Sequence, residues 1–302
     1  AGLQKMYTAI DTHMSLLQNK HHVVGSCDVS NAFQEFRRAA LLRSVSAHTK
    51  WRQLYKTLWA IYSPACKIVL RTTHDLTSDD GSVQGCPTGQ ACFCMAIHED
   101  VVWADRTLRA QGGFAIFYAD DGRFIGPPSH VYRTMKQFES RILTRLSLHY
   151  NKHKCGLWFR TPAHIPAFQQ QHPDCPYDIT TQGTMVNGVP MGTRGFIKAK
   201  LAEKIDEVSS DTKKICSLLH PVSLQNLYAL LVYCCNARVT FLSQLLPPRH
   251  TRSHLRKFDR LMRRIASIAT GVDISSQEDL VRSRIPLPPK LHGAGLRSTA
   301  DT

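Results

Sequence analysis

Two adjacent aspartates interrupt an apolar stretch near the middle of the chain. Asp120 and Asp121 lie in FAIFYADDGRFI, residues 114–125, between two runs rich in Phe, Ile and Tyr. A third aspartate, Asp28, ends the apolar segment HVVGSCD. Carboxylate oxygens are ligands of hard cations such as Mg²⁺, and two such cations held side by side catalyse phosphoryl transfer. The three aspartates are therefore a candidate two-metal site if the fold brings them together.

The same residues also have a purely structural interpretation. Asp-Gly between two apolar runs is a favoured two-residue turn, so the sequence predicts a β-hairpin that turns at Asp121–Gly122. Successive residues of a strand point to opposite faces, and Asp120 and Asp121 are therefore not expected to contribute alike. We expect Asp28 and Asp120 to bridge the metals and Asp121 to lie at the margin of the site.

The hydrophobic pattern predicts the elements that must position these aspartates. Helices are expected at residues 4–19, 32–45, 51–62, 88–110 and 129–146, and strands at 22–28, 67–72, 114–125 and within LHYNKHKCGLWF. This order indicates an α+β fold in which an antiparallel sheet is backed by helices. Residues 161–183, rich in Pro, Gln and His, are expected to be a connector, and residues 197–269 all helical. We place a domain change near residue 196.

The charge balance favours a polyanionic partner. The chain of 302 residues carries 38 Lys and Arg against 23 Asp and Glu, a formal net charge of +15, and nucleic acid is the usual partner of such a protein. No apolar run approaches the roughly 18 residues that a membrane span needs, and the N-terminal residues lack a signal-peptide pattern. We therefore expect an intracellular protein that does not use a membrane.

One predicted helix concentrates this positive charge. Residues 252–270 place apolar side chains at core spacing, with a basic face opposite them. The basic residues are Arg252, Arg256, Lys257, Arg260, Arg263 and Arg264. Such a face would contact the phosphates of a nucleic acid, although a run of charges on a helix also occurs as an ordinary solvated surface.

Four motifs together resemble those of a known enzyme family. DVSNAF (28–33), GSVQGCP (81–87), YADD (118–121) and LHYNKHKC (148–155) look like motifs A, B, C and D of reverse transcriptases, in that order. The resemblance is strongest to the enzymes of non-LTR retrotransposons. VNGVPMGT, a helix beginning FDRLM, and LHGAGLRS also resemble segments that follow the palm in those elements, so the resemblance extends over nearly the whole chain.

The resemblance implies a right-hand polymerase. Residues 1–160 would form the palm with a remnant of the fingers, residues 161–195 a connector with a primer-grip-like hairpin, and residues 196–302 a helical thumb. The implied activity is that of an RNA-directed DNA polymerase, which adds dNTPs to a DNA primer on an RNA or DNA template. Two Mg²⁺ ions are the implied cofactors, with Mn²⁺ as the alternative, and the nucleus is the expected compartment, with the cytoplasm as the alternative.

Roles can be carried over residue by residue. Asp28, Asp120 and Asp121 match the catalytic aspartates, and Val29 matches a further metal-binding position. Lys154 matches the lysine of motif D, a candidate proton donor to pyrophosphate; its alternative role is a contact with a backbone phosphate.

The nucleotide-binding positions follow in the same way. Phe33 occupies the place of a steric gate against the ribose 2′-hydroxyl, and otherwise it is an ordinary core residue. Gln84 and Gly85 match the motif B residues that approach the template and nucleotide, where glycine permits close backbone approach; otherwise they form a plain turn before a helix.

The sequence also departs from the family pattern. Thr88, Gly89 and Gln90 stand where many relatives carry a Leu-Ser-Pro-like stretch, which puts the local template contact in doubt. Only 27 residues precede Asp28, whereas the fingers motifs of the family lie upstream of motif A. We therefore expect this segment alone to polymerise weakly or not at all.

Two other functions remain open. One is a decayed palm and thumb that binds nucleic acid without catalysis, which the missing fingers and the basic helix favour. The other is an RNA-templated RNA polymerase, against which Phe33 and the YADD motif count.

Overall fold

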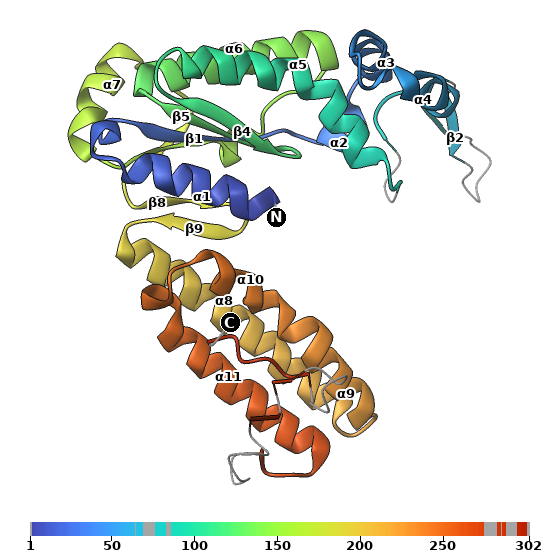
Figure 1. Ribbon diagram of the computed structural model, residues 1–302, viewed down its shortest axis with the longest axis vertical. Coiled ribbons are helices and arrows are strands. Elements are labelled where there is room, and N and C mark those ends of the chain that lie inside the picture. Colours follow the sequence, from blue (N-terminus) through green and yellow to red (C-terminus); the bar gives the residue numbers. More distant parts are fainter. Residues whose placement is uncertain are drawn as a thin grey trace. The chain divides into compact units, whose positions relative to one another are not determined.

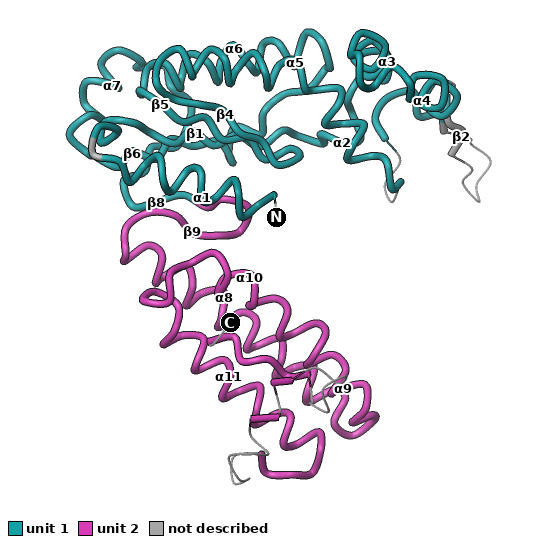
Figure 2. The backbone as a smooth tube through the Cα atoms, in the orientation of Figure 1, with its two compact units in different colours: residues 1–184 teal, residues 185–302 magenta. Residues whose placement is uncertain are grey.

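The computed structural model describes residues 2–63, 65–68, 76–82, 86–274, 283–284, 286–287 and 295–300. The chain divides into two compact units, residues 1–184 and 185–302, which Figure 2 colours separately. The boundaries expected near residues 160 and 196 stay predictions.

Unit 1 is built around a five-stranded sheet with the strand order β4-β5-β1-β6-β7. The strands are β1 Val23–Asp28, β4 Phe114–Tyr118, β5 Asp121–Gly126, β6 Gly156–Phe159 and β7 Asp178–Thr180. Every neighbouring pair is antiparallel except β6 and β7, which are parallel. The predicted α+β class with a mainly antiparallel sheet is therefore confirmed.

Helices cover both faces of this sheet (Figure 1). Helix α5 (Gly89–Arg109) and helix α6 (Pro128–Leu146) lie along one face, and helix α1 (Gly2–Ser15) lies along the other. On the α6 side, the ring of Phe138 packs against Phe117 at 5.1 Å and Phe124 at 5.5 Å between centroids. Burial of large aromatic side chains of this kind is a dominant stabilising term in a core.

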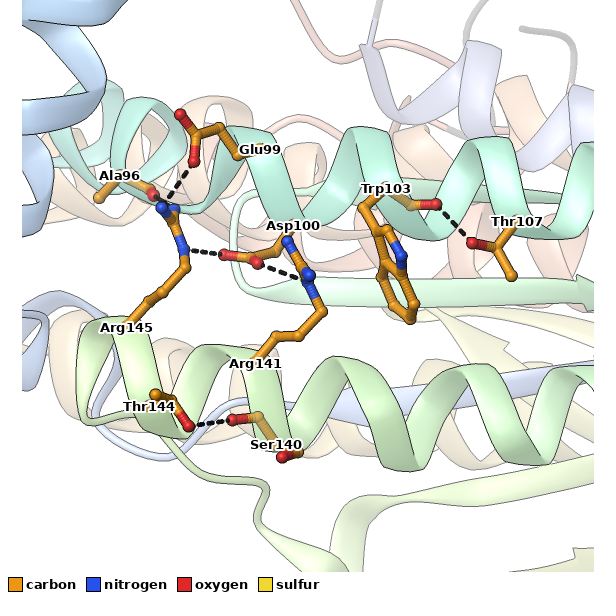
Figure 3. Close-up of polar contacts among 9 residues, drawn as sticks. All are labelled: Ala96, Glu99, Asp100, Trp103, Thr107, Ser140, Arg141, Thr144 and Arg145. Atoms are coloured by element: carbon orange, nitrogen blue, oxygen red, sulfur yellow. Dashed lines mark hydrogen bonds and ion pairs between the residues drawn. The ribbon is translucent and has the colours of Figure 1, made fainter.

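A buried charge network also joins α5 to α6. Asp100 of α5 is fully buried and accepts hydrogen bonds from Arg141 Nε at 2.9 Å and Arg145 Nε at 3.0 Å (Figure 3). Arg145 also pairs with Glu99 at 2.6 Å, and the Arg141 guanidinium lies 4.8 Å from the ring centre of Trp103. Because Asp100 is paired with two arginines, its charge can be buried at this helix contact.

The rest of unit 1 consists of short elements. They are α2 Ala32–Glu35, α3 Arg38–Ala47, α4 Tyr55–Tyr62, α7 Ile165–Gln171, the β2 (Cys66–Ile68) and β3 (Leu76–Ser78) pair, and 3₁₀ turns at Leu17–Asn19, Arg52–Leu54, Lys152–Lys154 and Pro162–His164. The helix expected over residues 32–45 is wrong as a single element, because Phe36 is extended, with φ −66° and ψ 137°. Its carbonyl accepts a hydrogen bond from Gly81 N at 2.8 Å, a long-range bond that replaces a helical one.

The segment expected to be a connector contains two packed elements. In α7, the buried ring of Phe168 contacts Tyr132 of α6 at 5.8 Å and Phe159 of β6 at 5.3 Å. Strand β7 then pairs with β6 and extends the sheet. Residues 165–180 are therefore part of the sheet layer, and the connector prediction is wrong there.

Unit 2 is helical, as the sequence predicts. A hairpin of β8 (Gly183–Val186) and β9 (Val189–Gly192) lies at the boundary between the units. The elements that follow are α8 Arg194–Leu219, α9 Leu224–Leu230, a π-helical segment Leu231–Cys235, α10 Ala237–Leu245 and α11 Pro248–Thr270. Thr193 caps α8 by accepting a hydrogen bond from Phe196 N, which satisfies one of the free amides at the start of the helix. None of the described helices combines the length and apolar character that a bilayer crossing requires.

Candidate functional site

The β4–β5 hairpin turns at Ala119–Asp120, because Tyr118 and Asp121 are register partners. Ala119 has φ 57°, a conformation that non-glycine residues rarely adopt, and a positive φ at the first turn position alone is the pattern of a type II′ turn. The predicted turn at Asp121–Gly122 is therefore wrong, since both residues lie within β5. Asp120 lies in the turn itself and is half-buried.

Gly122 serves packing and not the turn. Its register partners are Cys27 on β1 and Phe117 on β4. A Cβ atom at this position would overlap the Cys27 sulfur and the Phe117 ring. Glycine therefore leaves room for the side chains of Cys27 and Phe117 just beside the carboxylates.

The sheet register brings two of the aspartates together. Asp28, the last residue of β1, is the direct antiparallel partner of Asp121, the first residue of β5. Side chains of such partners share one face of the sheet, with Cβ atoms typically about 5 Å apart. Asp121 therefore lies directly across from Asp28, while Asp120 occupies the adjoining turn.

A polar cavity of about 420 Å³ opens at this end of β1. It is lined by Asp28, Val29, Ser30, Asn31, Ala32, Phe33, Gln34, Asp120, His149, Asn151 and Lys154. Asp28 and Asp120 thus face the same space, and Val29, Phe33 and Lys154 belong to the same wall. Within the described residues, the Asp120 side chain has no hydrogen bond or ion pair of its own.

Residues 149–151 extend the edge of the cavity by pairing with the end of β1. Ser30 N donates to His149 O at 3.0 Å, and Asn151 N donates to Asp28 O at 2.9 Å. This pairing carries Lys154 Nζ to 3.4 Å from Asp28 Oδ2, with the lysine side chain still 65% exposed. An exposed ammonium so close to a carboxylate can move towards a ligand in the cavity without breaking the fold.

The protonation of Asp121 is shifted by its surroundings. Burial raises the pKa of its carboxyl, and the negative charges of Asp120 and Asp28 act in the same direction. Arg123, whose NH1 atom lies 3.8 Å from Asp121 Oδ1, and Lys154 oppose this rise in the pKa. Three carboxylates this close repel one another, so a bound cation would lower the energy of the group.

Phe33 is held in place from two sides. Its ring packs 5.2 Å from that of Phe93 on α5. Its carbonyl accepts hydrogen bonds from Ser82 N at 2.7 Å and Ser82 Oγ at 3.1 Å. The aromatic wall of the cavity is therefore fixed by the segment that precedes α5, whereas Gln84 and Gly85 of that segment lie outside the described residues.

A buried arginine, which sequence reasoning missed, holds the same segment. Arg38 is 5% exposed and donates from Nε to Gly81 O at 2.8 Å and from NH1 to Ser78 O at 2.9 Å. Gly81 has φ 66° and lies against the Gln34 backbone, where a Cβ atom would not fit. The signal in the sequence was the glycine-punctuated GSVQG segment; nothing local indicated its partner. His149 and Asn151 lie in the LHYNKHKC motif, but their position beside Asp28 was not predicted, because the backbone pairing that places them is long-range.

The donor set fits a hard cation that is only partly held by protein. Within the part of the chain that the structure describes, no three His, Cys, Asp or Glu side chains are grouped closely enough to hold a metal ion by themselves. Mg²⁺ is usually bound by one or two carboxylates, with water and substrate phosphates as its other ligands. Asp28 and Asp120 would supply two carboxylates at the cavity, and this arrangement suits a metal that arrives with a nucleotide.

The basic residues predicted on the last helix lie on α11. Leu255, Phe258, Met262 and Ile265 are buried, and all six basic side chains from Arg252 to Arg264 are exposed. Ile268, for which the hydrophobic spacing predicted burial, is 41% exposed, although Ala266 and Ala269 beside it are buried.

Comparisons with known proteins give a likeness to solved structures. No protein-family model matches the sequence, and no curated protein matches it. Among solved structures, telomerase from Candida albicans in complex with a TWJ fragment of telomeric RNA is similar, with a TM-score of 0.44 and 11% sequence identity. The matched region covers 89% of this chain and 48% of that chain, so this chain spans about half the length of the telomerase. A likeness of this strength identifies neither the fold nor the function of this chain.

Proposed function

We propose that this chain is the core of a retrotransposon reverse transcriptase, an RNA-directed DNA polymerase of the non-LTR type. It would add dNTPs to the 3′ end of a DNA primer on an RNA or DNA template by two-metal nucleotidyl transfer. The main support is that Asp28 and the adjacent pair Asp120 and Asp121, which are far from Asp28 in the sequence, lie at one end of β1 beside a polar cavity that Asp28 and Asp120 line. The order of the four motifs around these residues is the second support.

The residues around the cavity suit the separate steps of that reaction. Asp28 and Asp120 would hold Mg²⁺, which when bound activates the primer 3′-hydroxyl and stabilises the leaving oxygen. Phe33 would lie against the sugar and exclude a 2′-hydroxyl. Lys154, whose Nζ is 3.4 Å from Asp28, would donate a proton to the departing pyrophosphate.

Primer extension tests the assignment of Asp120. In the full-length protein, Asp120→Asn is expected to lower extension on an RNA template by at least about a hundredfold, because a neutral amide is a poor ligand for Mg²⁺. Asp11→Asn, an equal change at an exposed position of α1, is the matched control and is expected to leave the rate unchanged. Equal activity of Asp120→Asn and the wild type would remove Asp120 from the mechanism.

The second candidate function is binding of nucleic acid without catalysis. The exposed basic face of α11 favours it, because such a face binds phosphates with or without an active site. Mg²⁺-independent RNA binding, with no extension by the full-length protein under any condition, would establish this function in place of polymerisation.

A further inference from the structure

Unit 2 contains a cavity of its own, of about 600 Å³, between α11 and the segment 295–300. Among the described residues it is lined by Arg256, Asp259, Arg260, Met262, Arg263, Ile274, Pro286, Leu296, Arg297, Ser298 and Ala300. Its volume is in the range of cavities that hold small ligands, roughly 300–1,000 Å³. Neither the aspartate site nor the motifs of unit 1 account for it.

Four arginines give this cavity a strong positive charge. Arg256, Arg260 and Arg263 are spaced so that they share one face of α11, and Arg297 comes from the segment opposite. Arg263 Nε donates to the backbone oxygen of Asp259 at 3.4 Å. The guanidinium groups of Arg256, Arg260 and Arg297 make no hydrogen bond or ion pair with another described residue.

The one carboxylate among these residues is already engaged. Asp259 is 7% exposed and accepts hydrogen bonds from Ser298 Oγ at 2.8 Å, Thr299 N at 2.9 Å, Thr299 Oγ1 at 2.7 Å and Ala300 N at 3.1 Å. Its oxygens are therefore occupied by the segment, and its single negative charge is outnumbered by the four arginines. By anchoring residues 298–300, Asp259 also fixes Arg297 beside the cavity, which makes it a positioning residue.

From these contacts we infer that the cavity is a binding site for a phosphate group of a nucleic-acid strand. Guanidinium groups present several N–H donors in a plane that matches phosphate oxygens, and here arginines from two chain segments line one cavity. Met262, Ile274 and Leu296 add apolar wall, so the cavity has room for part of the attached nucleotide. The inference rests on the proposed function only for the choice of nucleic acid as the source of the phosphate.

The site divides the basic residues of α11 into two sets, and this division provides the test. Arg256 and Arg260 line the cavity, whereas Lys257 and Arg264, equally exposed on the same helix, do not. The double variants Arg256→Gln/Arg260→Gln and Lys257→Gln/Arg264→Gln each remove two positive charges and keep good helix formers. Neither variant alters the hydrogen bonds of Asp259.

Fluorescence anisotropy with a labelled 12-nucleotide single strand compares the two variants with the wild type. The cavity variant is expected to bind at least tenfold more weakly and to lose about 0.7, the contribution of one phosphate, from the slope of log K against log salt concentration, while the control variant changes less than threefold. Equal losses from the two pairs would overturn the site and leave a diffuse basic face. Because no polymerisation is measured, failure of the proposed activity would not produce either result.

Two further arms identify the source of the phosphate and the role of the anchor. If a strand with a 5′-phosphate binds the wild type better than the same strand without it, and the cavity variant does not show this difference, the site holds a terminal phosphate. If the two strands bind the wild type equally well and the cavity variant still binds both tenfold more weakly, the site holds an internal phosphodiester. Asp259→Asn is expected to weaken binding with unchanged far-UV circular dichroism. Full affinity in that folded variant would overturn the positioning role of Asp259.

Discussion

At the scale of single residues, the site depends on small side chains beside the aspartates as much as on the aspartates. Ala119 takes a positive φ so that Asp120 can occupy a two-residue turn, and such a conformation costs roughly 1–3 kcal/mol unless the surroundings enforce it. Gly122 leaves room for the side chains of Cys27 and Phe117, which come from the strands on either side of β5. Both features influence the direction of the carboxylate side chains, so substitutions nearby affect both the stability of the protein and the geometry of the site.

Gly122→Ala is expected to destabilise the protein by about 1–3 kcal/mol, because the added methyl group overlaps the Cys27 sulfur and the Phe117 ring. Urea unfolding followed by circular dichroism measures the change. Gly195→Ala, in a helix with no atom near the added methyl group, is the control and is expected to be neutral or slightly stabilising. A Gly122→Ala protein as stable as the wild type would contradict the packing role.

Phe33→Ala tests the aromatic wall of the cavity. If the ring excludes a 2′-hydroxyl, its loss lowers the preference for dNTPs over ribonucleotides on the order of tenfold or more in single-nucleotide extension. A core role alone would instead reduce both rates equally. Phe196→Ala, the same deletion at a partly buried position of unit 2, is the control and leaves the preference unchanged.

At the scale of elements, long-range pairs set the positions of the helices around the sheet. The Asp100 network ties α5, which follows the segment that holds Phe33, to α6. A pair of histidines ties α1 to the start of β1, where His13 Nε2 and His22 Nδ1 share a hydrogen bond at 2.8 Å. The Asp100 network can be broken by one substitution, and the histidine pair by a change of pH.

Asp100→Asn is expected to lower the free energy of unfolding by about 3 kcal/mol, since it leaves Arg141 and Arg145 without their buried counter-charge. Glu99→Gln removes the exposed partner of Arg145 and is expected to cost less than about 1 kcal/mol. Denaturant titration of both variants measures the two values. Equal small effects would mean that the network contributes nothing beyond a surface pair.

The histidine pair predicts a pH dependence. Burial lowers the pKa of His22 from 6.5 to about 4, and the neighbouring His21 and His13 act in the same direction. As the pH falls, His22 is therefore protonated in the unfolded chain before it is protonated in the folded chain. Its contribution to the free energy of unfolding is fully present above pH 6.5 and falls, by at most about 3 kcal/mol, as the pH drops towards 4. Urea midpoints from pH 7.5 to 4.5 measure this slope, and His22→Gln should flatten it; an unchanged slope in that variant would assign the dependence to other groups.

At the scale of the whole molecule, the sequence was sufficient to predict the fold class and the order of most elements, but not the contacts between segments that are far apart in the chain. The α+β class, most helices and the helical unit 2 follow from hydrophobic periodicity, which local sequence contains. The turn at Ala119–Asp120 was misplaced because Asp-Gly is a strong local turn signal, and only packing against Cys27 and Phe117 explains why Gly122 is in a strand. The break at Phe36 depends in the same way on Gly81, distant in the chain.

The candidate site was predictable only as a set of residue types in order. Asp28, Asp120, Phe33 and Lys154 were singled out by motif, and they line one cavity; their catalytic roles stay predictions. The roles of Arg38 and Asp259 were not predicted, because each of these buried side chains depends on hydrogen-bond partners about forty residues away in the chain. No local pattern contains that information.

The anchoring of residues 298–300 by Asp259 also works as a non-covalent cross-link. The contact from Asp259 to Thr299 closes a loop of 40 residues, and closing a flexible loop of that length costs about 3 kcal/mol of chain entropy. Hydrogen bonds to a charged group contribute roughly 1.5–3 kcal/mol each, so the four bonds to this carboxylate together exceed the cost. Because all four bonds end on one carboxylate, release from Asp259 frees residues 298–300 together, and limited proteolysis after residue 297 is expected to follow a single opening step.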